Sequence, residues 1–262
     1  MDYLIIAAGT SFVFFMTCLG AGIVFFFKKP ITVGFRQIFL GFAAGMMAAA
    51  AIWGLLIPAM EEAEEAGLVE WLPAVVGFMA GVLFLLLLDR VIPHLHSTNQ
   101  REGKISEGQK RSTLLLSAIA LHNVPEGIAV GLSFALAAQQ GGGIAAYASA
   151  IALAIGIGIH NLPEGATVSL LFRQEGLSTK KSFLLGCLAG AIDFAFAVLT
   201  VFLGIWLVAA LPWLLAFAAG AMMYVVVAEM IPEAHLGNHS KIGAMSFMIG
   251  FLLMMVIDIG LG

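Results

Sequence analysis

The chain has 262 residues, of which 61% are hydrophobic and only 11% are charged, and its mean hydropathy is +1.03. Soluble domains carry about 25% charged residues, so this composition excludes an ordinary soluble domain, and no nucleic-acid partner is expected. The net charge of −4 gives little indication of function, because the positions of the charges matter more than their sum.

Apolar runs of roughly twenty residues recur along the whole chain, which is typical of transmembrane helices. The connecting segments are too short for a soluble domain, so the sequence predicts one polytopic α-helical membrane domain over residues 1–262. The first run is too long for a signal peptide and is expected to be retained. The eight predicted helices cover about 3–27, 34–58, 72–92, 113–138, 144–171, 182–209, 212–234 and 242–261, with a loop at 93–112.

The basic residues predict the orientation of these helices. All of them flank odd-numbered loops, and the positive-inside rule places that side, including loop 93–112, in the cytoplasm. Both termini are therefore expected outside, in a multi-pass protein of the cell (inner or plasma) membrane. The twelve residues are Lys28, Lys29, Arg36, Arg90, Arg101, Lys104, Lys110, Arg111, Arg173, Lys180, Lys181 and Lys241.

Short internal similarities indicate an inverted repeat. "FAAGMM" at 42–47 and "FAAGAMM" at 217–223 open the second and seventh predicted helices, and each is followed by Ile-Pro at a similar distance. Gly81 precedes Asp89 by eight residues, as Gly250 precedes Asp258. Helices one to three thus correspond to helices six to eight, which start on the opposite side. The resulting 3+2+3 arrangement, with a polar site near the midplane, is typical of transporters.

Helices four and five carry the same polar string, "HNVPEG" at 122–127 and "HNLPEG" at 160–165. Glu126 lies four residues after His122 and three after Asn123, so on a helix it neighbours both. The proline leaves one backbone carbonyl without its helical donor, and the glycine lets a partner helix approach closely. At about 1.5 Å per residue, His122 lies about 14 Å and His160 about 24 Å into their helices, so both strings are expected near the bilayer centre, with a metal site between helices four and five.

The acidic residues at this depth are expected to bind a cation. Each ionisable residue at mid-membrane costs roughly 2.5–3.5 kcal/mol, and no Lys or Arg is predicted at that depth to compensate. Imidazole, carboxylate and amide oxygen suit Zn²⁺, Fe²⁺ or Mn²⁺, whereas the absence of thiolates disfavours Cu(I). Four acids exceed the charge of one dication by two, which leaves room for a second metal or for bound protons. The candidate ligands are His122, Asn123, Glu126, His160, Asn161, Glu164, Asp193 and Glu229.

These residues resemble the ZIP family of divalent-metal transporters over essentially the whole chain. "HNVPEG" and "HNLPEG" match the metal motifs of the family's fourth and fifth helices, and having PEG in both is similar to the bacterial zinc-uptake branch. The chain departs from the family in helix six, where Asp193 is followed by Phe194 instead of Glu-Pro. The resemblance implies uptake of Zn²⁺, or of Fe²⁺, Mn²⁺ or Cd²⁺, as substrate without a cofactor. It also implies homodimers and an elevator-like motion of helices one, four, five and six.

Two other functions use the same residues. An intramembrane metal-dependent hydrolase could activate water with the same ligands and a glutamate base. The chain has no HExxH motif and no nucleophile elbow, and a duplicated motif favours a passageway over an active site. A proton-coupled carrier of organic solutes is disfavoured by the lack of mid-membrane Lys or Arg. A kinked helix with self-satisfied polar packing is the non-functional interpretation of the two strings.

Overall fold

The computed structural model describes residues 2–26, 32–99, 107–139, 145–174, 176–206, 208–234 and 241–261, and this part of the chain is all-helical. The first half contains α1 (Asp2–Ala21), η1 (Gly22–Phe25), α2 (Val33–Ala49), η2 (Ala50–Leu56), α3 (Ile57–Glu65), α4 (Trp71–Asn99) and α5 (Glu107–Gln139). The second half contains α6 (Ala148–Gln174), α7 (Thr179–Trp206), η4 (Val208–Ala210), α8 (Leu211–Val225), η5 (Val226–Met230), α9 (Ile231–Glu233) and α10 (Lys241–Leu261).

Several helices are longer than the apolar runs that predict them. The helical segment that begins at Val33 continues past Pro58 to Glu65, because the π-helical η2 before the proline accommodates its missing N–H. The predicted loop 93–112 is shorter, since α4 extends to Asn99 and α5 begins at Glu107.

Six helical segments of the described residues are long and apolar enough to cross a membrane by length and composition. Two further long helices, α5 and α6, contain the repeated His-Asn-x-Pro-Glu-Gly strings. The six are Asp2–Phe25, Gln37–Glu65, Trp71–Leu88, Thr179–Gly204, Leu211–Met230 and Lys241–Gly260.

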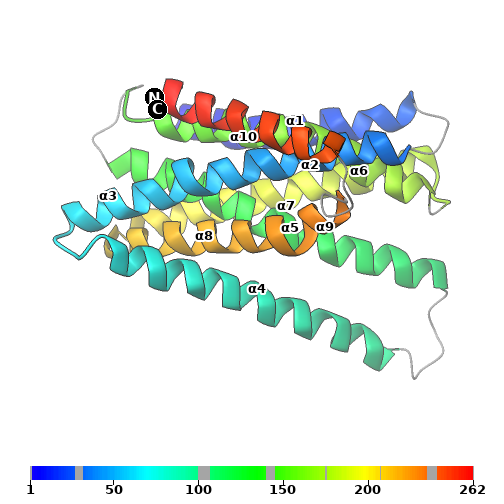
Figure 1. The fold of residues 1–262 in the computed structure, drawn as a ribbon, viewed down its shortest axis with the longest axis horizontal. Coiled ribbons are helices and arrows are strands. Elements are labelled where there is room, and N and C mark those ends of the chain that lie inside the picture. The colour runs from blue at the N-terminus through cyan, green and yellow to red at the C-terminus, as the bar shows by residue number, and fades with distance from the viewer. Residues whose placement is uncertain are drawn as a thin grey trace.

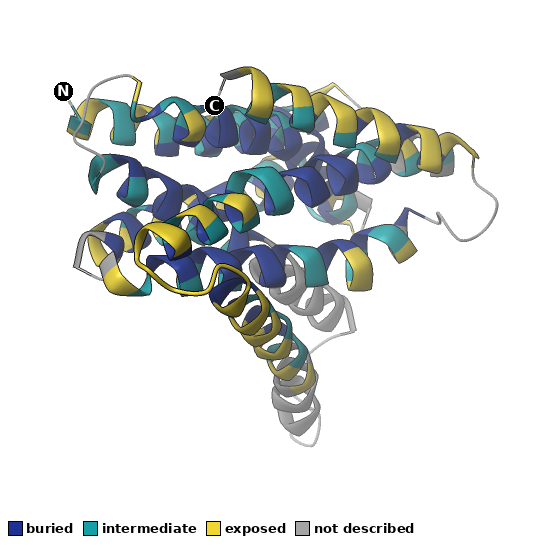
Figure 2. Ribbon diagram, turned by 60° about the vertical axis from the view of Figure 1, so that its left-hand side comes forward, coloured by how far each residue is buried: buried dark blue, intermediate teal, exposed yellow. Residues whose placement is uncertain are grey.

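The long helices form a bundle with both chain termini at one end (Figure 1). Its interior is buried, whereas the described part of α4 and one face of α10 are exposed (Figure 2). The exposed residues there are large and apolar, as expected for a surface that faces lipid rather than water. They include Val75, Val76, Met79, Leu83, Leu87, Met245, Met248, Leu252, Val256 and Ile259.

The helices pack most extensively in four pairs: α1 with α6, α5 with α7, α2 with α10, and α4 with α8. The first two pairs are joined by contacts of α7 with α1 and α6, so α1, α5, α6 and α7 form one helix group. The other helix group consists of α2, η2, α3, α4, α8, η5 and α10. Close approaches in this second group depend on glycine. An added Cβ would collide with the carbonyl oxygen of Phe217 at Gly81, and with that of Phe42 at Gly250. Small residues at helix contacts are the usual means of close packing in membrane bundles.

Two π-helical segments, η2 and η5, each end just before an Ile-Pro sequence. The N–H of Ile57 donates to the carbonyl of Ile52, and the N–H of Ile231 donates to the carbonyl of Val226, both five residues back. Each following proline cannot donate to the carbonyl four residues earlier, so the register widens by one residue at that point.

Candidate metal centre

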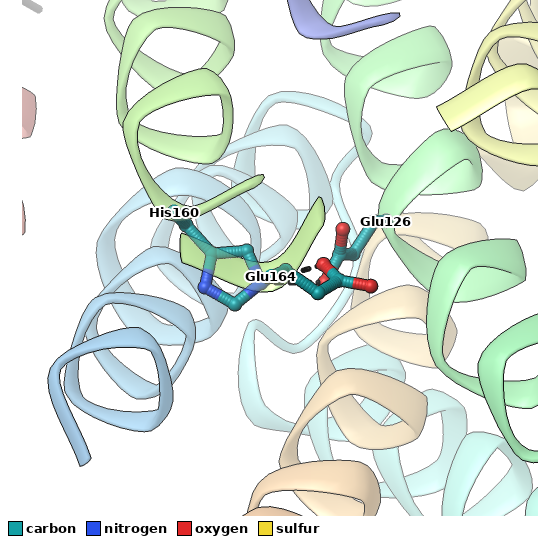
Figure 3. Close-up of side chains that lie close together, drawn as sticks. All are labelled: Glu126, His160 and Glu164. Carbon is teal, nitrogen blue, oxygen red and sulfur yellow. Dashed lines mark hydrogen bonds and ion pairs between the residues drawn. The ribbon is translucent and has the colours of Figure 1, made fainter. Parts of the chain in front are cut away.

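The two polar strings meet where α5 and α6 pack against each other. His160 and Glu164 lie one turn apart on α6, and Glu126 points toward them from α5 (Figure 3). His160 Nε2 lies 3.0 Å from Glu126 Oε1 and 3.4 Å from Glu164 Oε2. Glu126 therefore pairs with the histidine of the other string, across the interface between the two helices.

The spacing of these three groups suits a metal ion. Each residue offers one ligand atom, and the three atoms lie within 4.8 Å of one another. Zn²⁺ binds nitrogen and carboxylate oxygen at about 2.0–2.2 Å in a tetrahedron, whose ligand atoms are about 3.3–3.5 Å apart. The observed 3.0 and 3.4 Å are close to that spacing, so an ion could bind here with only small side-chain shifts.

The three side chains are almost completely shielded from solvent. The exposed fractions are 0% for Glu126, 1% for His160 and 8% for Glu164. Buried carboxylates are costly unless a cation or hydrogen-bond donors compensate them. Two carboxylates and a neutral imidazole would balance the charge of one dication.

A second set of polar side chains lies beside this cluster. The Asn161 amide, through Nδ2, donates to Asp193 Oδ2 at 2.8 Å and to Thr17 Oγ1 at 3.1 Å, and all three residues are buried. Asp193, on α7, is thus held by an amide donor and does not belong to the group of three close ligand atoms. Among the described residues, Asp193 Oδ1 and Asn161 Oδ1 have no hydrogen-bond partner, so each could still accept a bond from a ligand or water.

The remaining predicted ligands are placed less closely or are not described. Asn123 is fully buried on α5, and its amide has no hydrogen-bond partner within the described part of the chain. The side chain of His122 lies outside the described residues. Glu229 is half-buried in the π-helical η5 of the other helix group and is not part of the three-residue cluster.

The sequence analysis missed Thr17 and the backbone contacts that position the cluster. An added Cβ at Gly127 would collide with the carbonyl oxygen of Asp193, and one at Gly165 with that of Thr17. Glu126 therefore directly precedes a glycine at which α5 contacts α7, and Glu164 directly precedes a glycine at which α6 contacts α1. Thr17 and Asp193 occupy equivalent places in this arrangement, which is visible only in the structure.

Comparison with known proteins agrees with this geometry. Residues 94–258, which include both strings, match the family described as ZIP zinc transporter. The chain belongs to the ZIP zinc transporter family. Human zinc transporter ZIP11 is 34% identical over 97% of this chain and 96% of its own length.

Two bacterial relatives are similar over most of their length. Zinc transporter GufA of Myxococcus xanthus is 37% identical over 85% of this chain and 86% of its own length. Zinc transporter ZIPB of Bordetella bronchiseptica is 33% identical over 95% of this chain and 79% of its own length. The predicted family is confirmed, and these relatives are transporters by name.

Proposed function

We propose that this protein carries Zn²⁺, or another divalent transition metal, across the membrane through the cluster of Glu126, His160 and Glu164. The observation that carries the proposal is the convergence of three buried ligand atoms from two helices within 4.8 Å. Nitrogen and carboxylate oxygen are the ligands that Zn²⁺ and similar dications prefer. The metal is the transported substrate, and direction of transport into the cytoplasm follows the family resemblance.

The full ligand set in the proposal includes the neighbouring polar residues. His122 and Asn123 occupy the same positions in the string of α5 that His160 and Asn161 occupy in the string of α6. Asn123 is fully buried. Asp193 and Asn161 each retain one oxygen without a partner among the described residues, so they can complete the coordination of the ion or hold a bound water. Glu229 lies in a π-helical turn, a feature frequent at functional sites, and would bind the ion when it leaves the cluster.

The proposed architecture has eight membrane spans in a 3+2+3 inverted repeat. The packing pairs support it, because α2 with α10 corresponds to α8 with α4, and α1 with α6 corresponds to α7 with α5. The glycine contacts agree, since Gly250 against Phe42 corresponds to Gly81 against Phe217. Both termini lie at one end of the bundle, in keeping with an even number of spans (Figure 1).

The proposed orientation puts both termini outside a cell membrane, and it is supported by the restriction of Lys and Arg to the odd-numbered loops. The grouping of α1, α5, α6 and α7 supports a motion in which these helices carry the cluster past the other group. The protein would also form a homodimer, as the family resemblance implies.

Zn²⁺ flux into proteoliposomes that contain a metal-sensitive dye tests the proposed site. We expect saturable uptake by the wild-type protein and a loss of at least about tenfold in Glu126→Gln and Glu164→Gln, since even changing a residue that only orients a metal ligand costs about 10–100-fold. Glu70→Gln is the matched control, because Glu70 is exposed in the turn between α3 and α4.

Wild-type flux in either cluster variant, at equal amounts of inserted protein, would refute the site. Metal binding without flux in the wild-type protein would refute transport and favour the hydrolase alternative.

A further inference from the structure

An apolar groove lies between two packed helix pairs, α1 with α6 and α2 with α10. Its volume of about 530 Å³ is within the range of about 300–1,000 Å³ that is usual for ligand pockets. Ser246 is the one polar side chain among its lining residues in the described part of the chain, and its hydroxyl donates to the carbonyl of Ile242. The groove therefore suits an apolar ligand. The apolar lining includes Met16, Ile38, Phe42, Ile159, Leu162 and Ile249.

The two helix pairs that form the groove are fixed by glycine contacts. An added Cβ at Gly20 would collide with the carbonyl oxygen of Leu162, where α1 meets α6. An added Cβ at Gly45 would collide with the carbonyl oxygen of Phe247, where α2 meets α10. The helix α6 also packs against α2 and α10, whereas α1 has no comparable contact with either of them in the described part of the chain. The groove therefore lies where α1 and the pair of α2 and α10 remain apart.

The groove opens to the surface that faces lipid. Two of its lining residues, Ile38 and Ile249, are 44% and 56% exposed, and Ile249 follows directly after the exposed Met248 on α10. Apolar cavities do not hold ordered water, because a bound water needs polar partners. In a bilayer, the medium at this opening is lipid hydrocarbon.

A basic side chain lies at the end of the bundle from which the groove begins. Ile38 is five residues after the start of α2, and Ser246 is five residues after the start of α10, which is about 7.5 Å along each helix. Lys241, the first residue of α10, is exposed and makes no ion pair with another described residue. Arg36 precedes Ile38 by two residues in the sequence. Positive charge is thus placed at the membrane surface, about 7.5 Å above the groove.

We infer that the groove binds one acyl chain of an anionic phospholipid from the leaflet on the side of Lys241. The apolar lining matches a hydrocarbon chain, and the groove lies below Lys241 as an acyl chain lies below its headgroup. Lysine and arginine near the membrane surface attract anionic lipids, so the phosphate of the bound lipid would lie beside Lys241.

A lipid in this groove would contact both helix groups beside the proposed metal centre. Ile159 directly precedes His160, and Leu162 lies two residues before Glu164, so the groove is lined by neighbours of two proposed ligands. The helices α1 and α6 belong to the helix group that contains the cluster, and α2 and α10 belong to the other. Lipid binding requires neither metal nor transport, so it can be measured in metal-free protein and stands apart from the proposed function.

Photo-crosslinking of the metal-free, full-length protein in lipid nanodiscs tests the inference. The nanodiscs contain phosphatidylcholine and a small fraction of phosphatidylglycerol with a diazirine in one acyl chain, and peptide mass spectrometry locates the adducts. We expect saturable adducts on Met16, Ile159 and Ile249, which unlabelled phosphatidylglycerol displaces better than unlabelled phosphatidylcholine. Lys241→Gln should weaken phosphatidylglycerol binding about fivefold, which corresponds to about 1 kcal/mol per lysine. Lys181→Gln, which removes an exposed charge at the start of α7, is the control.

Ser246→Phe, which places an aromatic ring in the groove, tests the position of the acyl chain. Adducts on Met16 and Ile159 should fall by about tenfold or more, because the exclusion of two methylene groups already corresponds to that factor. Met248→Phe is the matched control, because Met248 is exposed on the same helix and does not line the groove. An unchanged thermal midpoint shows that Ser246→Phe is folded.

Three results would overturn the inference. The first is equal labelling of the groove residues in Ser246→Phe and Met248→Phe. The second is equal displacement of the probe by phosphatidylglycerol and phosphatidylcholine, or equal affinity in Lys241→Gln and Lys181→Gln. The third is labelling of the groove in monomeric protein but not in dimeric protein, which would show that a second copy of the chain covers the groove.

Discussion

Replacing Gly190 by alanine tests whether the contact between α1 and α7 positions the polar residues beside the proposed metal centre. An added Cβ at Gly190 would lie 2.7 Å from Thr17 Cβ and 2.8 Å from Thr17 Oγ1. Ordinary carbon–carbon contacts are about 3.5–4.0 Å, so the two helices must separate by about 0.8–1.3 Å. We expect the hydrogen bond from Asn161 Nδ2 to Thr17 Oγ1, now 3.1 Å, to break as Thr17 is displaced.

The expected magnitude follows from three effects of different sign. Overpacking costs about 1–3 kcal/mol. The broken hydrogen bond costs about 0.5–1.5 kcal/mol. Alanine in place of a mid-helix glycine gains about 0.5–1 kcal/mol. Asn161 keeps its bond to Asp193, so we expect only the energy of the lost hydrogen bond to affect Zn²⁺ binding at the proposed metal centre. That energy corresponds to an affinity for Zn²⁺ about 2–13-fold weaker.

Equilibrium Zn²⁺ binding and the thermal unfolding midpoint of the purified protein would measure both effects. Gly22→Ala is the matched control, because no atom lies within 4 Å of an added Cβ there. Equal affinity and equal midpoints for Gly190→Ala and Gly22→Ala would refute the argument that this contact holds Thr17 and Asn161 in place.

Three further predictions concern the same packing and network. Thr17→Val, which removes the acceptor of Asn161, should weaken Zn²⁺ binding about 2–13-fold while Thr17→Ser preserves it, as measured by equilibrium dialysis. Asp193→Asn should reduce Zn²⁺ affinity by about 10–100-fold in the same assay, and an unchanged affinity would exclude Asp193 from the site. Gly81→Ala and Gly250→Ala, which occupy equivalent contacts in the proposed repeat, should lower the thermal midpoint by similar amounts, and tolerance of only one would contradict their equivalence.

The helices and the centre of the site could be predicted from the sequence because their signals are local. A run of about twenty apolar residues must form its backbone hydrogen bonds within a helix in a membrane, so each run predicts a helix. The repeated string marked Glu126, His160 and Glu164 because imidazole and carboxylate at helical spacing are costly in hydrocarbon without a ligand.

The depth of the two strings predicts that helices four and five meet at them, but the partners of the other helices could not be predicted, because helices that are apolar all round give no indication of which face meets which neighbour. The spacing within "HNVPEG" pairs Glu126 with His122 and Asn123, yet in the structure it also lies 3.0 Å from His160 of the other string. Thr17 had no distinguishing pattern, since a threonine in a membrane helix usually bonds its own backbone, as Thr17 also does to Val13.

The proline–glutamate–glycine string combines ligand and packing roles in a way that explains its duplication. Gly127 allows a close contact of α5 with α7, and Gly165 allows one of α6 with α1, one residue after the glutamates that face the cluster. Because α1 and α7 also pack against each other, the two glutamates are positioned by one continuous set of contacts. A helix group built in this way can move as a unit without changing the distances among the ligands. This property is expected of a site that carries an ion, whereas an enzyme needs its acid and base in different environments.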